Sequence, residues 1–332
     1  MTIGIPRALL YYKYGALWEV FFEKLGADVM LSPETNRQIL GGGIKASIDE
    51  SCLPVKIFLG HIAHLIGKCD YILIPRVENL SKSDNDAACV KFFALYDIVN
   101  NTFGAELKAS ETRLLDYNID LKTGNTEKKA FLGMGKRLGY KHTAITEAYK
   151  AARTAQDERN AEKNREAAAA IYSDNLKILV IGHPYNVCDP YIGLPAVKYL
   201  NSLGLKTVFA HDFDAESCAG EAYKVSPTLC WAYNKELAGA AWLYKDLADG
   251  IIFITAFPCG PDSLVTELML RKFRGTPKIN LVIDELQSES GMATRLESFA
   301  DMIFSMRNAK FSMLNKRGVI SEEYDYQLSA SW

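Results

Sequence analysis

The chain has 332 residues, a formal net charge of -2 and 23% charged residues. This length exceeds one ordinary hydrophobic core and favours two domains. Because the charge is close to zero, electrostatics gives no reason to expect a nucleic acid or an anionic membrane as partner. The first residues lack the basic start and unbroken apolar core of a signal peptide, and no run of about 18 apolar residues occurs. We therefore expect a cytoplasmic protein without a membrane partner.

The first half of the chain alternates apolar stretches with helical patterns. TIGIPRALLYY, at residues 2–12, is apolar and is interrupted by Pro6, and ALWEVFFEKLG has the spacing of a helix. DVMLS is a candidate for a short strand, and a second strong strand is expected over Cys69–Val77. Runs of Val, Ile, Leu and Phe without alternation are typical of strands that are buried on both faces of a parallel sheet.

Cys52 stands in DESCLPVKIFLG, where Ser51 is a good helix N-cap and Pro54 is tolerated in a first turn. Apolar residues then recur at helical spacing, at Leu53, Ile57, Ile62, Leu65 and Ile66. We therefore expect Cys52 at a helix N-terminus, where unpaired N–H groups and the macrodipole favour thiolate over thiol. The alternative is that Cys52 is a small buried hydrophobe, as free cysteines often are.

The second half repeats the order of elements of the first. KILVIGHPYN, the helical VKYLNSLG and the strand candidate LKTVFAHD correspond to the opening segments, and a second strong strand is expected over Asp249–Phe257. The second half adds a further strand candidate, KINLVIDE. Between the halves, Thr146–Tyr172 contains no Gly or Pro and is rich in Ala, Glu, Lys and Arg. This composition predicts one long helix that is largely solvated.

These patterns predict an α/β protein with two Rossmann-like parallel-sheet domains of related topology, joined by the long helix. We place the boundary near residue 174, which gives an N-terminal α/β domain with its helical connector at 1–174 and a C-terminal α/β domain at 175–332. The apolar runs could instead be segments of buried helices, because periodicity alone does not separate short cases. Flanking Gly and Pro favour strands.

Ligands of parallel α/β sheets gather beyond the carboxyl ends of the strands. Four proline-containing stretches fall there, namely IPR, PRVEN, GHPYN and FPCGPDS, and we expect them to converge on one face. In FPCGPDS, Cys259 directly follows a strand and Gly260 permits close backbone approach. Asp262 or Ser263 can cap the helix that follows. Cys259 is therefore expected beside backbone donors, and the alternative is a turn cysteine without consequence.

The seven cysteines are widely scattered, and none forms a CxxC pair. An odd, scattered set does not resemble a secreted disulfide framework and does not favour a zinc-finger site. Cys89 stands where a polar loop runs into a helix, and Lys91 either lowers its pKa or solvates the helix end. Three thiolates from three such loop-to-helix junctions are what an iron–sulfur cluster with one open iron requires.

Five motifs occur in order along nearly the whole chain. They are IGIPRALLYY, ESCLPVK with GHIAHLIGKCDYILIPR, a C-x-K at Cys89, GHPYN followed by DPYIG, and FPCGPDS. As a set, these motifs resemble the family of 2-hydroxyacyl-CoA dehydratase component subunits (component D), and most closely its activase-associated, double-cubane-related branch. The resemblance implies that Cys52, Cys89 and Cys259 are the ligands of a 4Fe-4S cluster. It also implies a partner, an ATP-hydrolysing activase that is itself an iron–sulfur homodimer and delivers low-potential electrons.

In this family such electrons drive reductive or radical chemistry on an acyl-CoA or on a small molecule. The resemblance therefore implies a 2-hydroxyacyl-CoA dehydratase-like lyase or an ATP-dependent low-potential reductase, working as a homodimer or with a second related subunit. A double-cubane 8Fe cluster is the alternative cofactor, but the remaining cysteines are awkwardly placed for it. An electron-relay or scaffold subunit is the alternative function. A third reading, a cluster-free nucleotide-binding module, lacks any GxGxxG or GxxxxGK stretch.

Polar residues near the strand ends complete the candidate site. His183 and Tyr185 of GHPYN are candidates to donate hydrogen bonds to a substrate or to cluster sulfurs. Glu78 and Glu50 are candidate proton donors near the cluster. Asn186, by contrast, suggests a turn residue.

Other polar residues have structural explanations of equal weight. Arg7 and Arg76 each follow an Ile-Pro pair at a strand end, and they either meet an anionic substrate or form structural ion pairs. His61 and His64 lie one helical turn apart, which needs no metal to explain it. We expect Cys69 in the core, Cys218 and Cys230 in packing contacts, and Asp189 as a helix cap. Cys188 is expected to be either a bystander or a further ligand.

Overall fold

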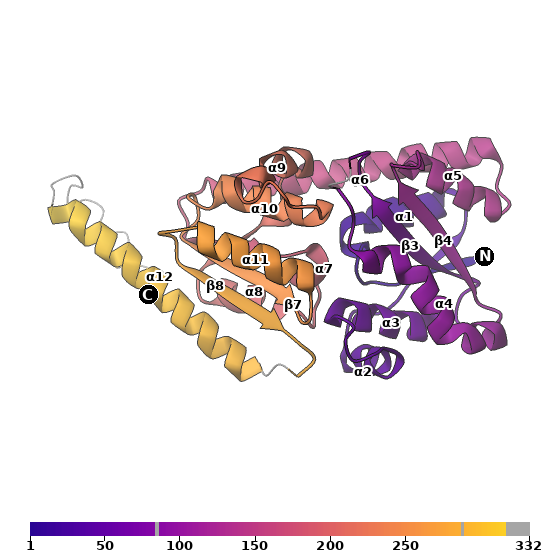
Figure 1. Cartoon of the computed structure of the whole chain (residues 1–332), viewed down its shortest axis with the longest axis horizontal. Helices are drawn as coiled ribbons and strands as arrows, with labels where there is room; N and C mark the ends of the chain where they lie inside the picture. The colour runs from indigo at the N-terminus through magenta and orange to yellow at the C-terminus, as the bar shows by residue number, and fades with distance from the viewer. Residues whose placement is uncertain (84–85, 287–288, 317–332) are drawn as a thin grey trace.

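The computed structural model describes residues 1–83, 86–286 and 289–316. It contains two sheets of four parallel strands each (Figure 1). The first sheet has the order β2-β1-β3-β4, with bounds β1 Thr2–Ile5, β2 Asp28–Leu31, β3 Tyr71–Asn79 and β4 Arg113–Asp120. The second has the order β6-β5-β7-β8, with bounds β5 Lys177–Ile181, β6 Lys206–Phe209, β7 Gly250–Ala256 and β8 Lys278–Ile283. The identical strand orders confirm two Rossmann-like sheets of related topology.

The strands with continuous apolar runs are the buried ones, as expected. Every residue of β5 and β7 is buried, because helices cover both faces of the sheet. The expectation that KINLVIDE has no counterpart in the first half is wrong, because residues 113–120 form β4 in the equivalent place. β4 reads RLLDYNID and lies at the edge of its sheet, where one face meets solvent and the apolar run breaks into alternation.

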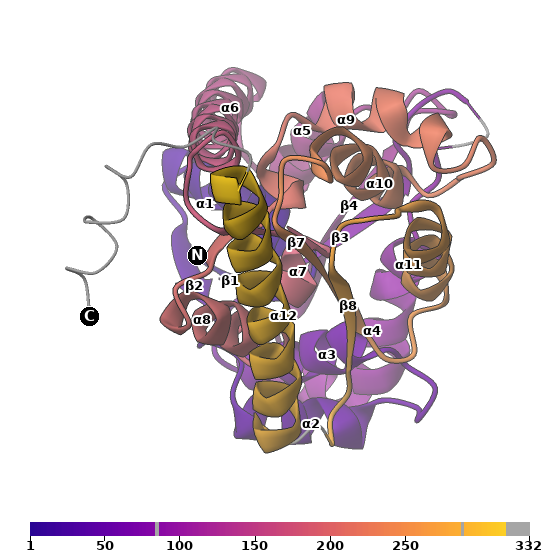
Figure 2. The same ribbon diagram turned by 90° about the vertical axis from the view of Figure 1, so that its left-hand side faces the viewer.

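Helices connect the strands of both halves. In the first half these are α1 Tyr11–Lys24, α2 Arg37–Ala46, α3 Leu53–Leu65, α4 Val90–Ser110 and α5 Glu127–Arg137. The second half contains α7 Pro184–Val187, α8 Leu194–Ser202, α9 Ala215–Glu221, α10 Ala232–Tyr244, α11 Gly260–Lys272 and α12 Glu289–Lys316, with 3-10 turns at Ala210–Asp212 and Ala222–Lys224. Figure 2 shows α12 lying across the outer end of the second half, where it packs on α8 and β8. None of the described helices is long and apolar enough to cross a membrane.

The long connector is α6, His142–Ile171, which begins four residues before the predicted start and runs along both halves (Figure 1). It packs on α1 and α5 in the first half and on β6 in the second. Gln156 in its middle is buried, and its side chain accepts a hydrogen bond from the N–H of Leu17 and donates one to the carbonyl of Lys13. The two sheets lie on either side of residue 174, and the division into domains at that residue stays a prediction.

Main-chain hydrogen bonds join the two halves at the carboxyl ends of their strands. The N–H of Leu53 donates to the carbonyl of Phe257 at 2.9 Å, and the N–H of Ala87 donates to the carbonyl of Cys230 at 3.0 Å. Apolar residues of both sheets also belong to one continuous buried cluster. The start of α3 is therefore held against the loop after β7, and the loop after β3 against the segment before α10.

Candidate functional site

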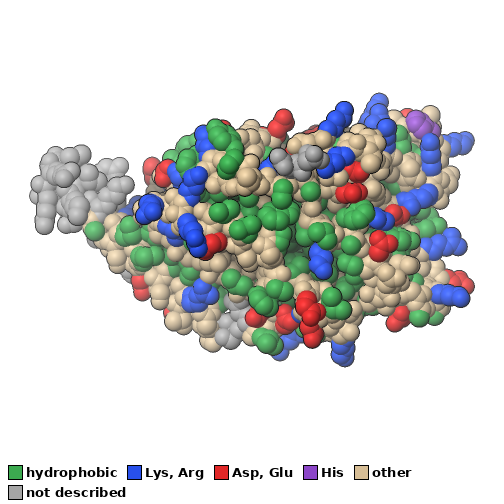
Figure 3. Space-filling model, in the orientation of Figure 1, with side chains coloured by type: hydrophobic (Ala, Val, Ile, Leu, Met, Phe, Trp, Pro, Cys, Tyr) green, Lys and Arg blue, Asp and Glu red, His purple; other side chains and the backbone are tan. Residues whose placement is uncertain are grey.

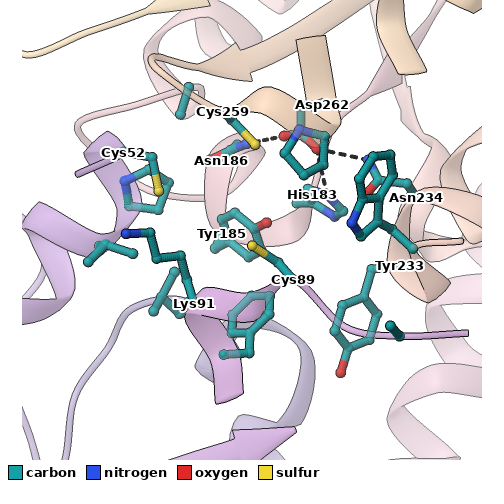
Figure 4. Close-up of a pocket in the computed structure, with 18 residues that line it drawn as sticks. Cys52, Cys89, Lys91, His183, Tyr185, Asn186, Tyr233, Asn234, Cys259 and Asp262 are labelled. Atoms are coloured by element: carbon teal, nitrogen blue, oxygen red, sulfur yellow. Dashed lines mark hydrogen bonds and ion pairs between the residues drawn. The ribbon is translucent and has the colours of Figure 1, made fainter. Parts of the chain in front are cut away.

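A cavity lies at this junction, with about 560 Å³ of space between its lining atoms, part of it open to solvent. Residues from both halves line it, including Cys52, Cys89, His183, Tyr185, Cys259 and Asp262 (Figure 4). GHPYN and FPCGPDS, which follow β5 and β7, reach it as the proline-marked strand ends predict. PRVEN does not, because Pro75 lies within β3 and the strand continues to Asn79. Arg7 of the IPR stretch is not among its lining residues.

Each of the three cavity cysteines is the N-cap residue of a helix. Cys52 caps α3, Cys89 caps α4 and Cys259 caps α11, which have 13, 21 and 13 residues. The prediction that Ser51 is the N-cap of α3 is wrong by one residue. The positive ends of three helix dipoles therefore point toward the cavity, where they favour an anionic occupant.

Burial is the largest influence on these thiols, and it raises the pKa of Cys52, Cys89 and Cys259. The backbone N–H groups of the first helical turns and the Lys91 ammonium lower the pKa of Cys52 and Cys89, but by less than burial raises it. The expectation that a helix N-terminus leaves Cys52 as a thiolate is therefore wrong for the protein alone. Desolvation of the sulfur outweighs the helix end.

Asp262 was expected as a helix cap, but its carboxylate is the centre of a buried hydrogen-bond network beside the cysteines (Figure 4). His183 Nε2 lies 2.9 Å from Oδ1, Asn234 Nδ2 donates to Oδ1 at 2.8 Å, and Asn186 Nδ2 donates to Oδ2 at 3.3 Å. Burial raises the pKa of Asp262, but the facing His183 and the hydrogen bonds outweigh it and hold this pKa below its usual value. Because the carboxylate is a pure acceptor, His183 donates from Nε2.

Tyr185 lies parallel to the His183 ring, with centroids 4.9 Å apart, and meets the edge of Phe92. Burial raises its pKa well above the ordinary value, and the nearby Asp262 and cavity cysteines raise it further. Tyr185 therefore keeps its phenolic proton at neutral pH and is a hydrogen-bond donor in the cavity. His183 and Tyr185 are thus brought to the cysteines, as predicted.

The structure places the other candidates outside the lining of this cavity. Glu78 lies on β3, and Glu50 lies in the exposed loop before Cys52. Arg7 pairs with Glu34 and Arg76 with Asp97, each at 3.6 Å. Both arginines therefore form structural ion pairs, which is one of the two roles expected for them.

Cys230 is not a lining residue but directly precedes Trp231, which lines the cavity. Cys69, Cys188, Cys218, His61 and His64 are not lining residues either. Cys188 lines a different cavity beside α1 and α6, and its sulfur lies 3.7 Å from His211 Nε2. Cys218 is buried in the second half under α10, and Cys69 packs beside Gly4. His61 is fully buried between two hydroxyl side chains, whereas His64 lies beside Lys68 in an exposed position.

Exposed apolar side chains stand close to the three cysteines in the sequence, and Figure 3 shows hydrophobic side chains across the middle of one face of the molecule. Val90 follows Cys89 and is 70% exposed, and Phe257, two residues before Cys259, is 54% exposed. Ile48, Phe93 and Leu264 belong to the same set of exposed residues. Exposed apolar side chains that lie together are typical of a contact site for another molecule.

Within the described residues, no group of three or more His, Cys, Asp or Glu side chains is arranged to hold a single metal ion. A four-iron cube makes a different demand, because its cysteines bind separate corners and do not converge on one atom. Three sulfurs around one partly open cavity suit that donor pattern, and helix N-termini at all three suit its anionic thiolates. The residues present therefore fit a cluster of this kind.

The fold and the cavity define an α/β protein with two parallel sheets and a three-cysteine site where they meet. Residues 2–212 match the family described as CoA enzyme activase uncharacterised domain (DUF2229), and the chain belongs to this family. The matched region contains Cys52, Cys89, His183 and Tyr185, but it ends before Cys259. A search of curated proteins finds no match to the chain. The family agrees in general terms with the predicted relation to CoA-enzyme activases.

Proposed function

We propose that this chain is an iron–sulfur protein that accepts low-potential electrons from an ATP-hydrolysing activase. Cys52, Cys89 and Cys259 hold one 4Fe-4S cluster in the junction cavity, and the corner without a cysteine faces a small substrate or an acyl-CoA. The observation that carries the proposal is the position of these three residues. They come from distant parts of the sequence, cap three separate helices and line the same cavity.

The position of the other cysteines supports one cubane over a double-cubane cluster. Cys69, Cys188, Cys218 and Cys230 are not among the residues that line the cavity. A second cubane there would need thiolates that the surrounding segments do not supply.

When bound, the cluster supplies one-electron chemistry at low potential. The chain's own residues bind and orient what enters beside it. Tyr185 presents a protonated hydroxyl, and Asp262 fixes the proton of His183 at Nε2 and thereby orients the ring. Lys91 adds a positive charge at the rim, near Cys52 and Cys89. Tyr185 and Lys91 favour an occupant that carries acceptor oxygens or a negative charge.

The exposed apolar residues next to the three cysteines in the sequence support a partner that docks at this junction and delivers electrons over a short distance. The sequence has no nucleotide-binding motif of its own, so ATP hydrolysis belongs to that partner. Reduction at low potential is therefore expected to need both the activase and ATP. Rapid and complete reduction by an ordinary ferredoxin without ATP would exclude this electron source.

Anaerobic iron and sulfide analysis, with an EPR spectrum of the reduced protein, tests the cluster. Wild-type protein should contain four irons per chain, as expected for one cubane. Cys52→Ala, Cys89→Ala and Cys259→Ala should each lose the cluster or convert it, because two thiolates hold a cubane poorly.

Three substitutions outside the cavity are the matched controls. Cys69→Ala, Cys188→Ala and Cys230→Ala should keep the wild-type iron content and EPR signal. If Cys188→Ala instead loses about half of its iron, the protein holds a larger cluster that includes this residue. The assignment fails if Cys259→Ala, purified without oxygen, keeps both its full iron content and the wild-type signal.

A further inference from the structure

A second cavity lies between α1, α6 and the end of α7, with about 510 Å³ of space between its lining atoms, part of it open to solvent. It shares no lining residue with the cysteine cavity. Three of its lining residues are cations, Lys13, Arg159 and Lys163, and none is an Asp or a Glu. A cavity whose charged lining is entirely positive favours an anionic occupant.

Arg159 differs from the two lysines because it forms no ion pair in the described part of the chain. Lys13 pairs with Glu236, and Lys163 pairs with Asp212 at 3.1 Å. Arg159 is also an exposed residue, so it is open to a molecule that enters from solvent. A free guanidinium presents N–H groups in a fork that matches the oxygens of a carboxylate or phosphate group.

Two side chains from different walls of the cavity locate the charge of Arg159. Burial is the largest influence on Tyr11 of α1 and on Cys188 at the end of α7, and it raises the pKa of each. The charge of Arg159 opposes both shifts, so it lies close enough to act on both groups. Lys163 also lowers the pKa of Cys188. Both cations of α6 therefore lie near this sulfur.

The thiol of Cys188 adds no negative charge to the cavity. Its Sγ lies 3.7 Å from His211 Nε2, and His211 Nδ1 lies 3.2 Å from the carbonyl oxygen of Gly182. The carbonyl only accepts, so the ring proton is on Nδ1 and Nε2 accepts from the thiol. Burial raises the pKa of Cys188 to about 11 and lowers that of His211 to about 4, so both groups are uncharged at neutral pH. The nearby Asp189 carboxylate is buried and accepts a hydrogen bond from Tyr12.

We infer that this second cavity binds a small organic anion, with its carboxylate or phosphate group on Arg159 and the rest of the molecule toward Cys188. Lys163 lies one helical turn further along α6, on the same face, and adds a second positive charge. The inference does not depend on the proposed cluster, because the two cavities share no residue.

A matched pair of alkylating reagents tests the site. Iodoacetate and iodoacetamide each transfer a two-carbon group to a thiol and release iodide, but only iodoacetate carries a carboxylate. Peptide mapping by mass spectrometry, after labelling without oxygen, measures the rate at Cys188. Labelling of the wild-type protein by iodoacetate should saturate with concentration, because the reagent binds before it reacts. Labelling by iodoacetamide should rise linearly.

Two arginine variants test the anchor. The ratio of iodoacetate to iodoacetamide labelling at Cys188 should fall by about tenfold in Arg159→Gln, which corresponds to about 1.4 kcal/mol of binding. Arg165→Gln is the matched control, because Arg165 is exposed on the same helix but does not line this cavity. It should keep the wild-type ratio and the saturation.

Competition identifies the anionic group that the site prefers. Acetate and inorganic phosphate are added separately at equal ionic strength, with chloride as the reference. Protection of Cys188 from iodoacetate by acetate alone assigns a carboxylate ligand, and protection by phosphate alone assigns a phosphate ligand. Protection by both shows that Arg159 accepts either group. Equal protection by chloride shows charge screening only and overturns the site, as does protection by none of them.

The remaining outcomes also decide the matter. Iodoacetate labelling that does not saturate, or an equal ratio in wild type and Arg159→Gln, overturns the inference. An equal fall in Arg165→Gln assigns the effect to the general charge of α6 and overturns it too. If neither reagent labels Cys188, the cavity does not admit a molecule of this size and the inference fails. Iron content is measured separately, so the proposed function and this site can fail independently.

Discussion

Replacing His61 with Gln should flatten the dependence of stability on pH. His61 lies on α3, the helix that Cys52 caps, and it is 0% exposed. Thr35 donates to the carboxylate of Asp189 at 2.6 Å, so its oxygen must accept from His61 Nε2. His61 Nδ1 then accepts from the hydroxyl of Ser32 at 2.8 Å. The ring is therefore neutral, with its single proton on Nε2.

The sign of the effect follows from the direction of the pKa shift. Burial, together with smaller effects of the neighbouring His64 and Arg7, lowers the pKa of His61 from 6.5 to about 3. A proton therefore binds the unfolded chain more readily than the folded one. The stabilisation from neutral His61 is complete above pH 6.5 and is lost as the pH falls from 6.5 toward 3.

The size of the effect can be worked out for a convenient interval. Between pH 7 and pH 5, an unfolded histidine of ordinary pKa takes up most of one proton, while folded His61 takes up almost none. At about 1.4 kcal/mol per pKa unit, the free energy of unfolding should fall by about 2 kcal/mol through this one residue. The loss comes in addition to the contributions of all other titrating groups.

Urea unfolding at pH 7, 6 and 5 measures the difference. The drop in unfolding free energy from pH 7 to pH 5 should be about 2 kcal/mol smaller in His61→Gln than in wild type, because the other groups cancel in the comparison. His142→Gln is the matched control, since His142 is exposed in the first turn of α6 and should leave the slope unchanged. Equal slopes in wild type and His61→Gln would refute the buried, neutral state of His61.

Two further substitutions probe the packing around the site. Gly60→Ala should destabilise the fold by about 1–3 kcal/mol or more in urea unfolding, because a Cβ there would lie 1.9 Å from the carbonyl oxygen of Ile39 where α2 meets α3. Gly41→Ala, which meets nothing within 4 Å, should instead be neutral or stabilising, and a similar loss in both would show that close packing is not the cause. Asp262→Asn should lower stability by about 1–3 kcal/mol, because the amide keeps only one acceptor oxygen and its NH₂ group then faces a donor, either Asn186 or the pair His183 and Asn234. Asp246→Asn, at an exposed pair with Lys245, should change it by less than about 1 kcal/mol, and equal losses would contradict the network.

The sequence predicts most of the fold because buried parallel strands carry continuous apolar runs. β5 and β7 could be recognised in this way, and the repeated order of elements predicted two related sheets. β4 was missed because it lies at a sheet edge, where alternation and polar residues weaken the signal. The signal that could have found it is the need for a fourth strand to match β8 in the second half.

The location of the candidate site could be predicted from the sequence, because strand ends and helix starts indicate where it lies. Cys52, Cys89 and Cys259 stand at loop-to-helix junctions in the sequence, and the structure brings them to one cavity. Their role as cluster ligands stays a prediction. Asp262 and Asn186 were read as cap and turn residues, because both types are common at such positions. Only the three-dimensional contact between segments 76 residues apart identifies them as parts of one network.

The protonation of the thiols could not be read from local sequence for a similar reason. A helix start favours thiolate, but desolvation depends on what the other half of the molecule places over the sulfur. Cys52 and Cys259 come from different halves, and each lies close to the other half. The N–H of Leu53, next to Cys52, is bonded to the carbonyl of Phe257, near Cys259. The pKa values of these thiols are therefore a property of the closed junction.

The main-chain bonds at the junction explain how three cysteines from two halves can serve one site. Leu53 and Phe257 are bonded beside Cys52 and Cys259, and Ala87, two residues before Cys89, is bonded on both sides to the segment 230–232. Backbone hydrogen bonds do not depend on side-chain rotamers, so they fix the separation of the helix starts themselves. In that arrangement burial keeps the thiols protonated, whereas a bound metal cluster would displace those protons as it coordinates the sulfurs. The junction thus creates a cavity that is unfavourable for isolated thiolates, and the proposed cluster would neutralise their charge.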